Sequence, residues 1–359
     1  MEKSLALVVA ILAAAVNPAA AQEKIAVTPE LIAAANAEGE MTLQYSAPLN
    51  AMQALVAEFD KVYPKIKINL ERKAGSSGVQ SLLQEISAGV NRLDMFQGTD
   101  TSANAELVKQ KAFAAITFSN IDEFSPVALG LAPYLYYPDS YQNVVLYNPK
   151  FVTDAEAEKL RSWDGILDPA FKGKISLVEP TFGVTIGPLL YVMNQPKLGE
   201  DFLRKLKAQN PIIFINTAQA RDAVLSGRAP ISWGAQWDSV VYSDYERGAP
   251  VRFLFPHPTA EWGGNGWAVL AKAPHPNAAR LFFAWAMTKD GAMAIQGPQY
   301  NARSTMKTVE DTRAVLPKLK NEPWFKPVGT DLWQADVKDW VENAPRYQEL
   351  WTKIMKAGR

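Results

Sequence analysis

The chain has 359 residues, of which 48% are hydrophobic and 21% charged, a composition typical of a soluble globular protein of about two domains. Its 37 Lys and Arg residues balance its 37 Asp and Glu residues, so no overall field favours nucleic acid or an anionic membrane. The absence of cysteine excludes disulfides, thiol nucleophiles and thiolate metal sites.

The N-terminal segment, residues 1–21, has the three parts of a secretory signal peptide. Lys3 precedes an apolar run at residues 5–16, and a small-residue ending follows at residues 17–21. The run is shorter than the roughly 20 residues that a membrane-spanning helix needs, so an uncleaved anchor is the less favoured alternative. We therefore expect cleavage after Ala21 and a mature protein in the periplasm.

Strands and helices alternate through the first part of the mature chain. Strands are predicted at residues 41–46, 66–70 and 93–96, with helices at residues 52–63 and 79–89. This order predicts a parallel sheet with right-handed crossovers, and ligands bind such sheets outside the carboxyl ends of the strands. The residues expected at that edge are Tyr45, Ser46, Ser76, Ser77, Gly78, Thr99 and Asp100.

The Gly/Ser turn at residues 74–78 joins a predicted strand to the start of a predicted helix. Free backbone N–H groups at a helix start, together with two hydroxyls, suit a carboxylate, a phosphate or a sulfate. The alternative is that Ser76 or Ser77 only caps its own helix. Because the turn lies at a strand end and faces a second lobe with a matching turn, we interpret it as half of a clamp on the ligand.

A second α/β unit is predicted in the middle of the chain. It has strands at residues 143–147, 174–178, 212–215 and 230–233, and helices at residues 201–209 and 217–227. Its strand-end candidates for ligand contact are Glu179, Thr181, Phe182, Gly183, Trp233, Gln236, Trp237 and Asp238. Two such lobes facing one another would enclose a cleft.

The last part of the chain is predicted to cross between the lobes again. Strands at residues 251–255 and 266–270 are expected to return to the first lobe, and the loop between them contains Glu261 and Trp262. Helices follow at residues 277–287, 291–296 and 337–355. The predicted division is a first lobe of residues 22–146 plus about 257–310, and a second lobe of residues 147–256 plus about 311–359.

Four stretches in this order resemble the extracellular solute-binding proteins of bacterial ABC importers. They are Trp-Asp-Gly-Ile-Leu-Asp-Pro-Ala-Phe-Lys-Gly-Lys at residues 163–174, Ala-Arg-Asp-Ala-Val-Leu-Ser-Gly at 220–227, Gly-Ala-Pro-Val at 248–251 and Ala-Ala-Arg-Leu-Phe-Phe at 278–283. More narrowly, they resemble the group that includes ferric-iron, thiamine, polyamine and aminoethylphosphonate binders. The resemblance implies an α/β type II periplasmic-binding fold with crossover strands as a hinge. It also implies closure on one solute and delivery to an inner-membrane permease, without chemistry.

Several side chains could recognise the solute. Arg303 follows the turn at residues 298–301, where the family often has an arginine beside the cleft, and it could bind a carboxylate or phosphonate or form a salt bridge. Asn301 belongs to the same turn. Trp237 and Trp262 could stack on an organic ligand, Trp262 being expected in the cleft, while Trp233 could instead be core. Four carboxylates could bind an ammonium group or pair with basic residues: Asp100, Glu179, Asp238 and Glu261.

No cofactor and no metal are expected, since His257 and His275 both lie in His-Pro turns. Ferric-iron members of the family use adjacent tyrosines at the segment that is Gln-Trp-Asp-Ser here (residues 236–239), often with a histidine that residues 45–49 lack. The preferred interpretation is a monomer that binds a small organic anion or zwitterion and no nucleic acid. The alternatives are a ferric-iron carrier that uses an exogenous anion, and an exported hydrolase with Glu179 and Glu261 as paired carboxylates.

Overall fold

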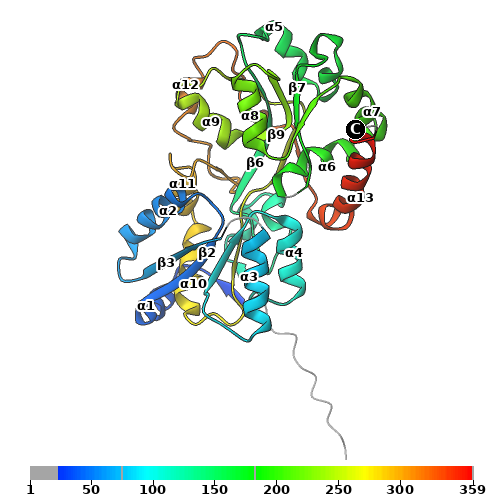
Figure 1. The fold of residues 1–359 in the computed structure, drawn as a ribbon. Coiled ribbons are helices and arrows are strands. Elements are labelled where there is room, and N and C mark those ends of the chain that lie inside the picture. Colours follow the sequence, from blue (N-terminus) through cyan, green and yellow to red (C-terminus); the bar gives the residue numbers. More distant parts are fainter. Residues whose placement is uncertain (1–22, 74–75, 182, 358–359) are drawn as a thin grey trace, which may run out of the picture.

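The computed structural model describes residues 23–73, 76–181 and 183–357. The predicted signal peptide and the predicted ligand contact Phe182 lie outside these residues. The described chain forms two lobes, which are drawn one above the other in Figure 1 and are joined by several crossings of the chain.

The first lobe is built on a four-stranded sheet with the strand order β12-β4-β2-β3. β2 pairs in parallel with both β3 and β4, which confirms the predicted parallel arrangement, whereas β12 is antiparallel to β4. A small parallel ribbon of β1 and β5 lies beside this sheet. In chain order these strands are β1 (Glu23–Ile25), β2 (Glu40–Tyr45), β3 (Lys67–Arg72), β4 (Met95–Gly98), β5 (Ile116–Phe118) and β12 (Gly266–Val269).

Helices cover both faces of the first sheet. Buried residues of α1, α2, α10 and α11 belong to one apolar cluster, and those of α3 and α4 belong to another. α2 buries Met52, Leu55 and Phe59, whose three- and four-residue spacing places them on one face of the helix. The helices are α1 (Pro29–Glu38), α2 (Leu49–Val62), α3 (Ser76–Ser87), α4 (Thr101–Lys109), α10 (Pro276–Ala286) and α11 (Lys289–Ile295).

The second lobe contains an eight-stranded sheet in the order β14-β11-β6-β9-β7-β8, and β10 and β13 also pair with β6. Its strands are β6 (Asp139–Tyr147), β7 (Ile175–Val178), β8 (Ile212–Phe214), β9 (Ile231–Trp237), β10 (Arg252–Leu254), β11 (Thr259–Gly263), β13 (Arg303–Ser304) and β14 (Leu332–Gln334). One apolar cluster includes side chains of α5, α6, α7 and α13, and another includes those of α8, α9 and α12. These helices are α5 (Asp154–Ala157), α6 (Gly187–Asn194), α7 (Gly199–Ala208), α8 (Thr217–Leu225), α9 (Asp238–Glu246), α12 (Leu316–Leu319) and α13 (Val337–Met355).

The chain crosses between the two sheets next to β6. Just before β6, Tyr136 bridges to Trp267 of β12 in the first sheet. β11 belongs to the second sheet and leads through Gly264 and Asn265 directly into β12. A side chain at Gly264 would place its Cβ 2.2 Å from Asp139 Oδ2, so glycine is required for this close approach of two crossings.

Two predictions about the crossings are wrong. The segment 256–264 was expected as a loop, but β11 is a strand with every residue buried, paired with β6 on one side and β14 on the other. Burial on both faces removes the alternation that identifies a half-buried strand, and the neighbouring prolines and glycines suggest a turn. The segment 251–255 was expected to return to the first lobe, but β10 pairs with β6 in the second. The predicted division also put residues 139–146 in the first lobe, whereas they belong to the second sheet as part of β6.

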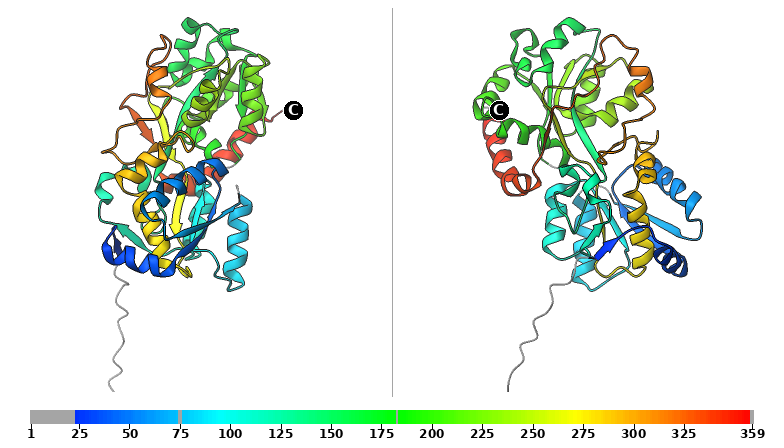
Figure 2. Two further views of the ribbon diagram at one scale, coloured as in Figure 1. Left: turned by 90° about the vertical axis from the view of Figure 1, so that its left-hand side faces the viewer. Right: turned by 180° about the vertical axis from the view of Figure 1, so that it is seen from behind.

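The C-terminal helix α13 contacts both lobes. Val337, at its start, belongs to the apolar cluster of α3 and α4 in the first lobe. Trp340, Tyr347 and Trp351 belong to the cluster of α6 and α7 in the second lobe. The helix therefore packs beside α4 at one end and α7 at the other, as the views in Figures 1 and 2 show.

Gly187, at the start of α6, lies against the Trp262 ring of β11. Substitution of this glycine therefore tests how tightly β11 is packed. An added Cβ would lie 2.6 Å from the Trp262 ring, so we expect Gly187→Ala to destabilise the protein by about 1–3 kcal/mol. Urea unfolding measures this loss. The same substitution in a Trp262→Leu background should cost less, and an equal cost in both backgrounds would show that the ring is not the obstacle.

Candidate functional site

A pocket of about 310 Å³ lies between the lobes, and we call it the interlobe pocket. Its walls come from the start of α2, from β6, from α8, from the end of β9 with α9, and from the segments around residues 265 and 299–302. The lining residues are Ala47, Pro48, Ala51, Tyr141, Arg221, Trp237, Ser239, Val240, Ser243, Arg247, Asn265, Gln299, Tyr300, Asn301 and Ala302. Its volume falls in the range of small-molecule sites.

Two helix starts, one from each lobe, line the interlobe pocket. α2 follows Pro48, and α9 follows Trp237; neither of these two residues makes a side-chain capping hydrogen bond. Pro48 has no polar side chain, and the indole of Trp237 carries no acceptor for backbone N–H groups. The first N–H groups of a helix have no partner within it and carry partial positive charge, so both helix starts favour an anion in the pocket.

Two arginines on the second-lobe wall share one carboxylate. Arg221 Nε forms an ion pair with Asp244 Oδ2 at 3.0 Å, and Arg247 Nη2 donates to Asp244 Oδ1 at 2.5 Å. The Asp244 side chain is 7% exposed, whereas that of Arg247 is 69% exposed. One unit of positive charge is therefore in excess in this cluster, and Arg247 has donors left for a bound anion.

An amide–phenol network forms the wall of the pocket nearest the crossings. Asn265 Nδ2 lies 3.2 Å from the Tyr141 hydroxyl and 3.1 Å from the Tyr300 hydroxyl. The same amide donates to Asp139 Oδ2 at 2.9 Å, and Gln97 Nε2 donates to the Tyr300 hydroxyl at 3.1 Å. Asn265 Oδ1 is buried without a hydrogen-bond partner among the described residues, so it is available to a donor group on a ligand.

Burial shifts the pKa values of this network. It raises the pKa of the Asp139 carboxyl to about 7, although hydrogen bonds from Asn265 oppose the shift. Burial also raises the pKa of the Tyr141 and Tyr300 phenols, and the nearby Asp139 charge adds to this effect. Both phenols are therefore neutral near pH 7, and each can donate or accept a hydrogen bond.

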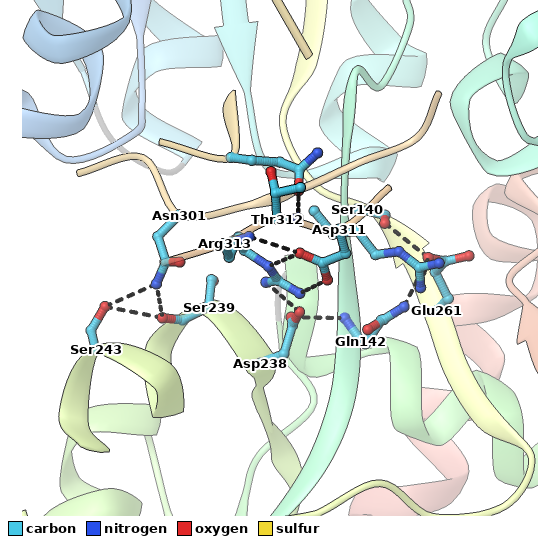
Figure 3. Close-up of polar contacts among 12 residues, drawn as sticks. Ser140, Gln142, Asp238, Ser239, Ser243, Glu261, Asn301, Asp311, Thr312 and Arg313 are labelled. Carbon is cyan, nitrogen blue, oxygen red and sulfur yellow. Dashed lines mark hydrogen bonds and ion pairs between the residues drawn. The ribbon is translucent and has the colours of Figure 1, made fainter. Parts of the chain in front are cut away.

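Two of the predicted contacts, Trp237 and Asn301, line the interlobe pocket. The Trp237 ring packs on that of Tyr141 with centroids 5.6 Å apart and gives the pocket an aromatic side. Asn301 Nδ2 donates to the Ser239 carbonyl at 3.2 Å and approaches Ser243 Oγ at 3.4 Å, and this contact holds the start of α9 (Figure 3). The predicted Tyr45 and Ser46 directly precede the lining residue Ala47, but they are not themselves part of the wall.

The predicted contacts Thr99, Asp100 and Gly183 lie elsewhere on the boundary between the lobes. An added Cβ on Gly183 would be 3.3 Å from the Thr99 carbonyl oxygen, so the second-lobe turn approaches the turn at residues 98–100 of the first lobe. Asp100 accepts from Ala103 N at 3.1 Å and thereby caps α4. Among the predicted contacts in these turns and in the Gly/Ser turn whose side chains the structure describes, six do not line the interlobe pocket: Ser77, Gly78, Thr99, Asp100, Thr181 and Gly183.

Four further candidates have structural partners instead. Trp233 packs against Trp163 and Phe202 in the core of the second lobe, and Gln236 Nε2 donates to the Thr217 carbonyl at 3.2 Å. Glu179 forms an ion pair with Lys356 at 2.8 Å. The expectation that Trp262 faces the cleft is corrected, because β11 directs its ring into the apolar core against α6.

Asp238 and Glu261 lie in polar contacts among the crossings, shown in Figure 3, and Arg303 forms an ion pair with Glu261 at 3.6 Å. Asp238 forms an ion pair at 2.6 Å with Arg313, and both side chains are fully buried. Arg313 also pairs with Asp311 at 2.7 Å and lies over the Tyr242 ring, 4.6 Å from its centroid. The fixed position of α9 depends on this group, because Asp238 is the first residue of that helix.

The residues that the sequence did not reveal are those without a local pattern. Five pocket residues and one buried ion pair partner were missed: Tyr141, Arg221, Arg247, Asn265, Tyr300 and Arg313. Each acquires its role from a neighbour more than twenty residues away, apart from Arg247 beside Asp244. A weak signal was present only for Arg221, which lies in one of the stretches that suggested the family.

The family model described as bacterial extracellular solute-binding protein matches residues 45–293, which is more than half of the chain. The chain belongs to this family. No curated protein sequence matches the chain closely enough to count as a relative. No helix in the described part of this solute-binding protein is long and apolar enough to span a bilayer.

Solved structures share the fold of this solute-binding protein. Iron-bound HitA from Pseudomonas aeruginosa is 19% identical with a TM-score of 0.69, over 88% of this chain and 99% of that one. FutA of Trichodesmium, in complex with iron and citrate, is 17% identical with a TM-score of 0.69 over the same shares. AfuA from Actinobacillus pleuropneumoniae, with bound fructose-6-phosphate, is 17% identical with a TM-score of 0.65, over 89% and 99%. The fold is that of type II periplasmic binding proteins, as the resemblance implied.

Removal of Arg313 should strongly destabilise the protein. Arg313→Met leaves Asp238 buried without its cation, and breaking one partner of a buried pair costs about 3–5 kcal/mol. Urea unfolding of this variant should show that loss, and the added change Asp238→Asn should recover part of it. Arg204→Gln, on the exposed face of α7, is the control and should cost at most about 1 kcal/mol. An Arg313→Met variant as stable as this control would contradict the assignment.

The raised pKa of Asp139 predicts a pH dependence of stability. The folded protein keeps the Asp139 proton up to about pH 7, whereas the unfolded chain releases it near its ordinary value of 3.8. The contribution of Asp139 to stability therefore falls as the pH rises between those values. Asp139→Asn should be more favourable at pH 8 than at pH 5 relative to the native protein, by on the order of a few kcal/mol. Thermal unfolding at both pH values measures this, with the exposed Asp122→Asn as control; identical pH profiles would exclude Asp139 as the group.

Proposed function

We propose that this protein is the periplasmic solute-binding component of an ABC importer and that it captures a small organic anion or zwitterion. The ligand class is a carboxylate or phosphonate, held in the interlobe pocket by closure of the lobes and then delivered to the membrane permease. One observation carries the proposal: two helix starts without side-chain caps and an excess arginine charge line the same pocket.

The proposed solute has an anionic head and a second end that can donate a hydrogen bond. The head would lie near Arg247 and Arg221, where bidentate guanidinium contacts are available. Asn265 Oδ1 would accept from an ammonium or hydroxyl group, since it has no partner among the described residues. The body of the solute would pack on Trp237 and Tyr141.

The structural relatives are compatible with an oxyanion in such a pocket. FutA holds citrate with its iron, and AfuA holds fructose-6-phosphate. The family and the fold belong to binding proteins associated with transport. A predicted signal peptide supports export to the periplasm, and the predicted monomeric state remains a prediction.

The hydrolase alternative gains no support from its two carboxylates. Glu179 pairs with Lys356, and Glu261 accepts hydrogen bonds on the other side of β6; neither lines the interlobe pocket. Paired carboxylates that act on a glycosidic bond must flank one substrate. These two carboxylates do not do so.

One observation favours a ferric-iron carrier as the second candidate. The hydroxyls of Tyr141 and Tyr300 both contact the amide of Asn265 and both residues line the pocket, so two phenols are available to one bound species. The tyrosine pair that ferric-iron members have at the segment of residues 236–239 is absent from this sequence, and Tyr141 and Tyr300 come from other segments. An iron-loaded protein that absorbs visible light, and that loses the absorbance in Tyr141→Phe, would support iron over an organic anion.

Solute binding can be screened by thermal shift with carboxylates, phosphonates, amino acids, polyamines and sugars. A ligand at 100 times its dissociation constant stabilises the protein by about 2.7 kcal/mol. For the ligand found, the double variant Arg221→Gln/Arg247→Gln should weaken binding in calorimetry at least tenfold, because it removes both guanidinium groups from the pocket. Arg204→Gln removes an arginine charge on the exposed face of the same lobe, outside the pocket. This control variant should leave the affinity unchanged.

A second variant distinguishes the interlobe pocket from the site that the sequence suggested. Ser76→Ala/Ser77→Ala changes the Gly/Ser turn, of which the described residues Ser77 and Gly78 do not line the pocket. We expect this variant to bind the solute as tightly as the native protein does. Loss of binding in this variant but not in the arginine variant would move the solute to the turn and refute the proposed site.

A further inference from the structure

A second pocket of about 260 Å³ lies on the opposite side of β6, and we call it the rear pocket. It shares no lining residue with the interlobe pocket. Neighbouring side chains of a strand point to opposite faces, and β6 divides its side chains accordingly. Tyr141 lines the interlobe pocket, whereas Ser140 and Gln142 bind Glu261, which lines the rear pocket.

Both carboxylates that line the rear pocket already have donors. Glu261 Oε1 accepts from Ser140 Oγ at 2.9 Å and from Gln142 Nε2 at 3.3 Å, while its Oε2 accepts from Gln334 Nε2 at 2.8 Å. Asp311 accepts from Arg313 Nε at 3.0 Å and from Arg313 Nη2 at 2.7 Å. Neither carboxylate needs a cation from within the pocket to satisfy its oxygens.

Of the two cations that line the rear pocket, Arg303 forms a long ion pair with Glu261 but no hydrogen bond to it, and Lys307 forms neither within the described chain. Arg303 Nη1 is buried and lies 3.6 Å from Glu261 Oε1, which is too far for a hydrogen bond. It has no hydrogen-bond partner among the described residues. Lys307 is exposed at the rim, and within the described chain its ammonium group makes no ion pair or hydrogen bond. A buried donor without an acceptor costs about 1–3 kcal/mol, so an acceptor in this pocket would be stabilising.

We propose that the rear pocket is a second binding site, separate from that of the transported solute, for a small oxyanion bearing a carboxylate or phosphate group. Arg303 Nη1 donates to one oxygen of the anion, and the Lys307 ammonium group approaches from the rim. Glu261 remains in its ion pair with Arg303 at 3.6 Å, so the additional positive charge for the anion comes from Lys307. The fixed position of the guanidinium follows from β13, which pairs Arg303 with Ser140 of β6.

The site can be tested in a protein whose interlobe pocket is disabled. In the Arg221→Gln/Arg247→Gln variant, calorimetric titrations with inorganic phosphate and with acetate should still show saturable binding of at least one of these anions at one site. The added change Arg303→Gln should weaken that binding at least tenfold, and Lys307→Gln should weaken it severalfold. Lys320→Gln, an exposed lysine of the same C-terminal region that does not line the pocket, is the matched control.

The titrations also identify the anion class and can overturn the proposal. Tighter binding of acetate assigns a carboxylate, and tighter binding of phosphate assigns a phosphate group. Absence of saturable binding of both anions in the double variant, or binding that Arg303→Gln leaves unchanged, refutes the rear site. Circular dichroism monitors folding, and if Arg303→Gln unfolds the protein, the exposed Lys307→Gln decides instead. Failure of solute binding at the interlobe pocket does not affect this test, because that pocket is disabled throughout.

Discussion

The buried charges of Arg313, Asp238 and Asp311 hold together the part of the molecule where the lobes meet. Charges removed from water are costly unless they are paired, so this group tolerates little displacement of its members. Asp238 begins α9, and the backbone N–H of Gln142 in β6 also donates to it at 3.2 Å. The position of the α9 start, and hence of the second-lobe wall of the interlobe pocket, depends on this ion pair.

Several electrostatic contributions to anion binding, each weak by itself, add together in the interlobe pocket. Each helix start contributes partial charges, and the arginine pair contributes about one unit of positive charge beside Asp244. In water such charges would be largely screened, but the lobe closure proposed above would remove water and strengthen each of them. Selectivity among anions is then left to neutral groups such as Asn265, Tyr300 and Asn301, whose positions are fixed by hydrogen bonds.

The sequence predicted the elements with regular periodicity and missed the contacts made by distant residues. The parallel strands of the first lobe and the bounds of α13 were correct, because their apolar spacing is clear. The loop prediction for residues 256–264 failed, because β11 is buried on both faces and flanked by prolines and glycines. Ligand contact by the Gly/Ser turn stays a prediction; in the first lobe, Pro48 and Ala51 line the interlobe pocket, whereas Ser77 and Gly78 do not. Nothing local distinguishes Arg313 from a surface arginine.

Helix α13 begins against the first lobe and extends along the second lobe. Val337 and Val341 pack among side chains of the first lobe, whereas Trp340, Tyr347 and Trp351 pack in the apolar cluster of the second lobe. The 19 residues of α13 extend about 28 Å at 1.5 Å per residue, so a rotation of about 20° at Val337 displaces the far end by about 10 Å. If the lobes rotate about Val337, the far end of α13 is displaced relative to the first lobe, and the distance between a reporter group on the exposed Lys353 and a second one on the first lobe would follow closure without contact with the solute.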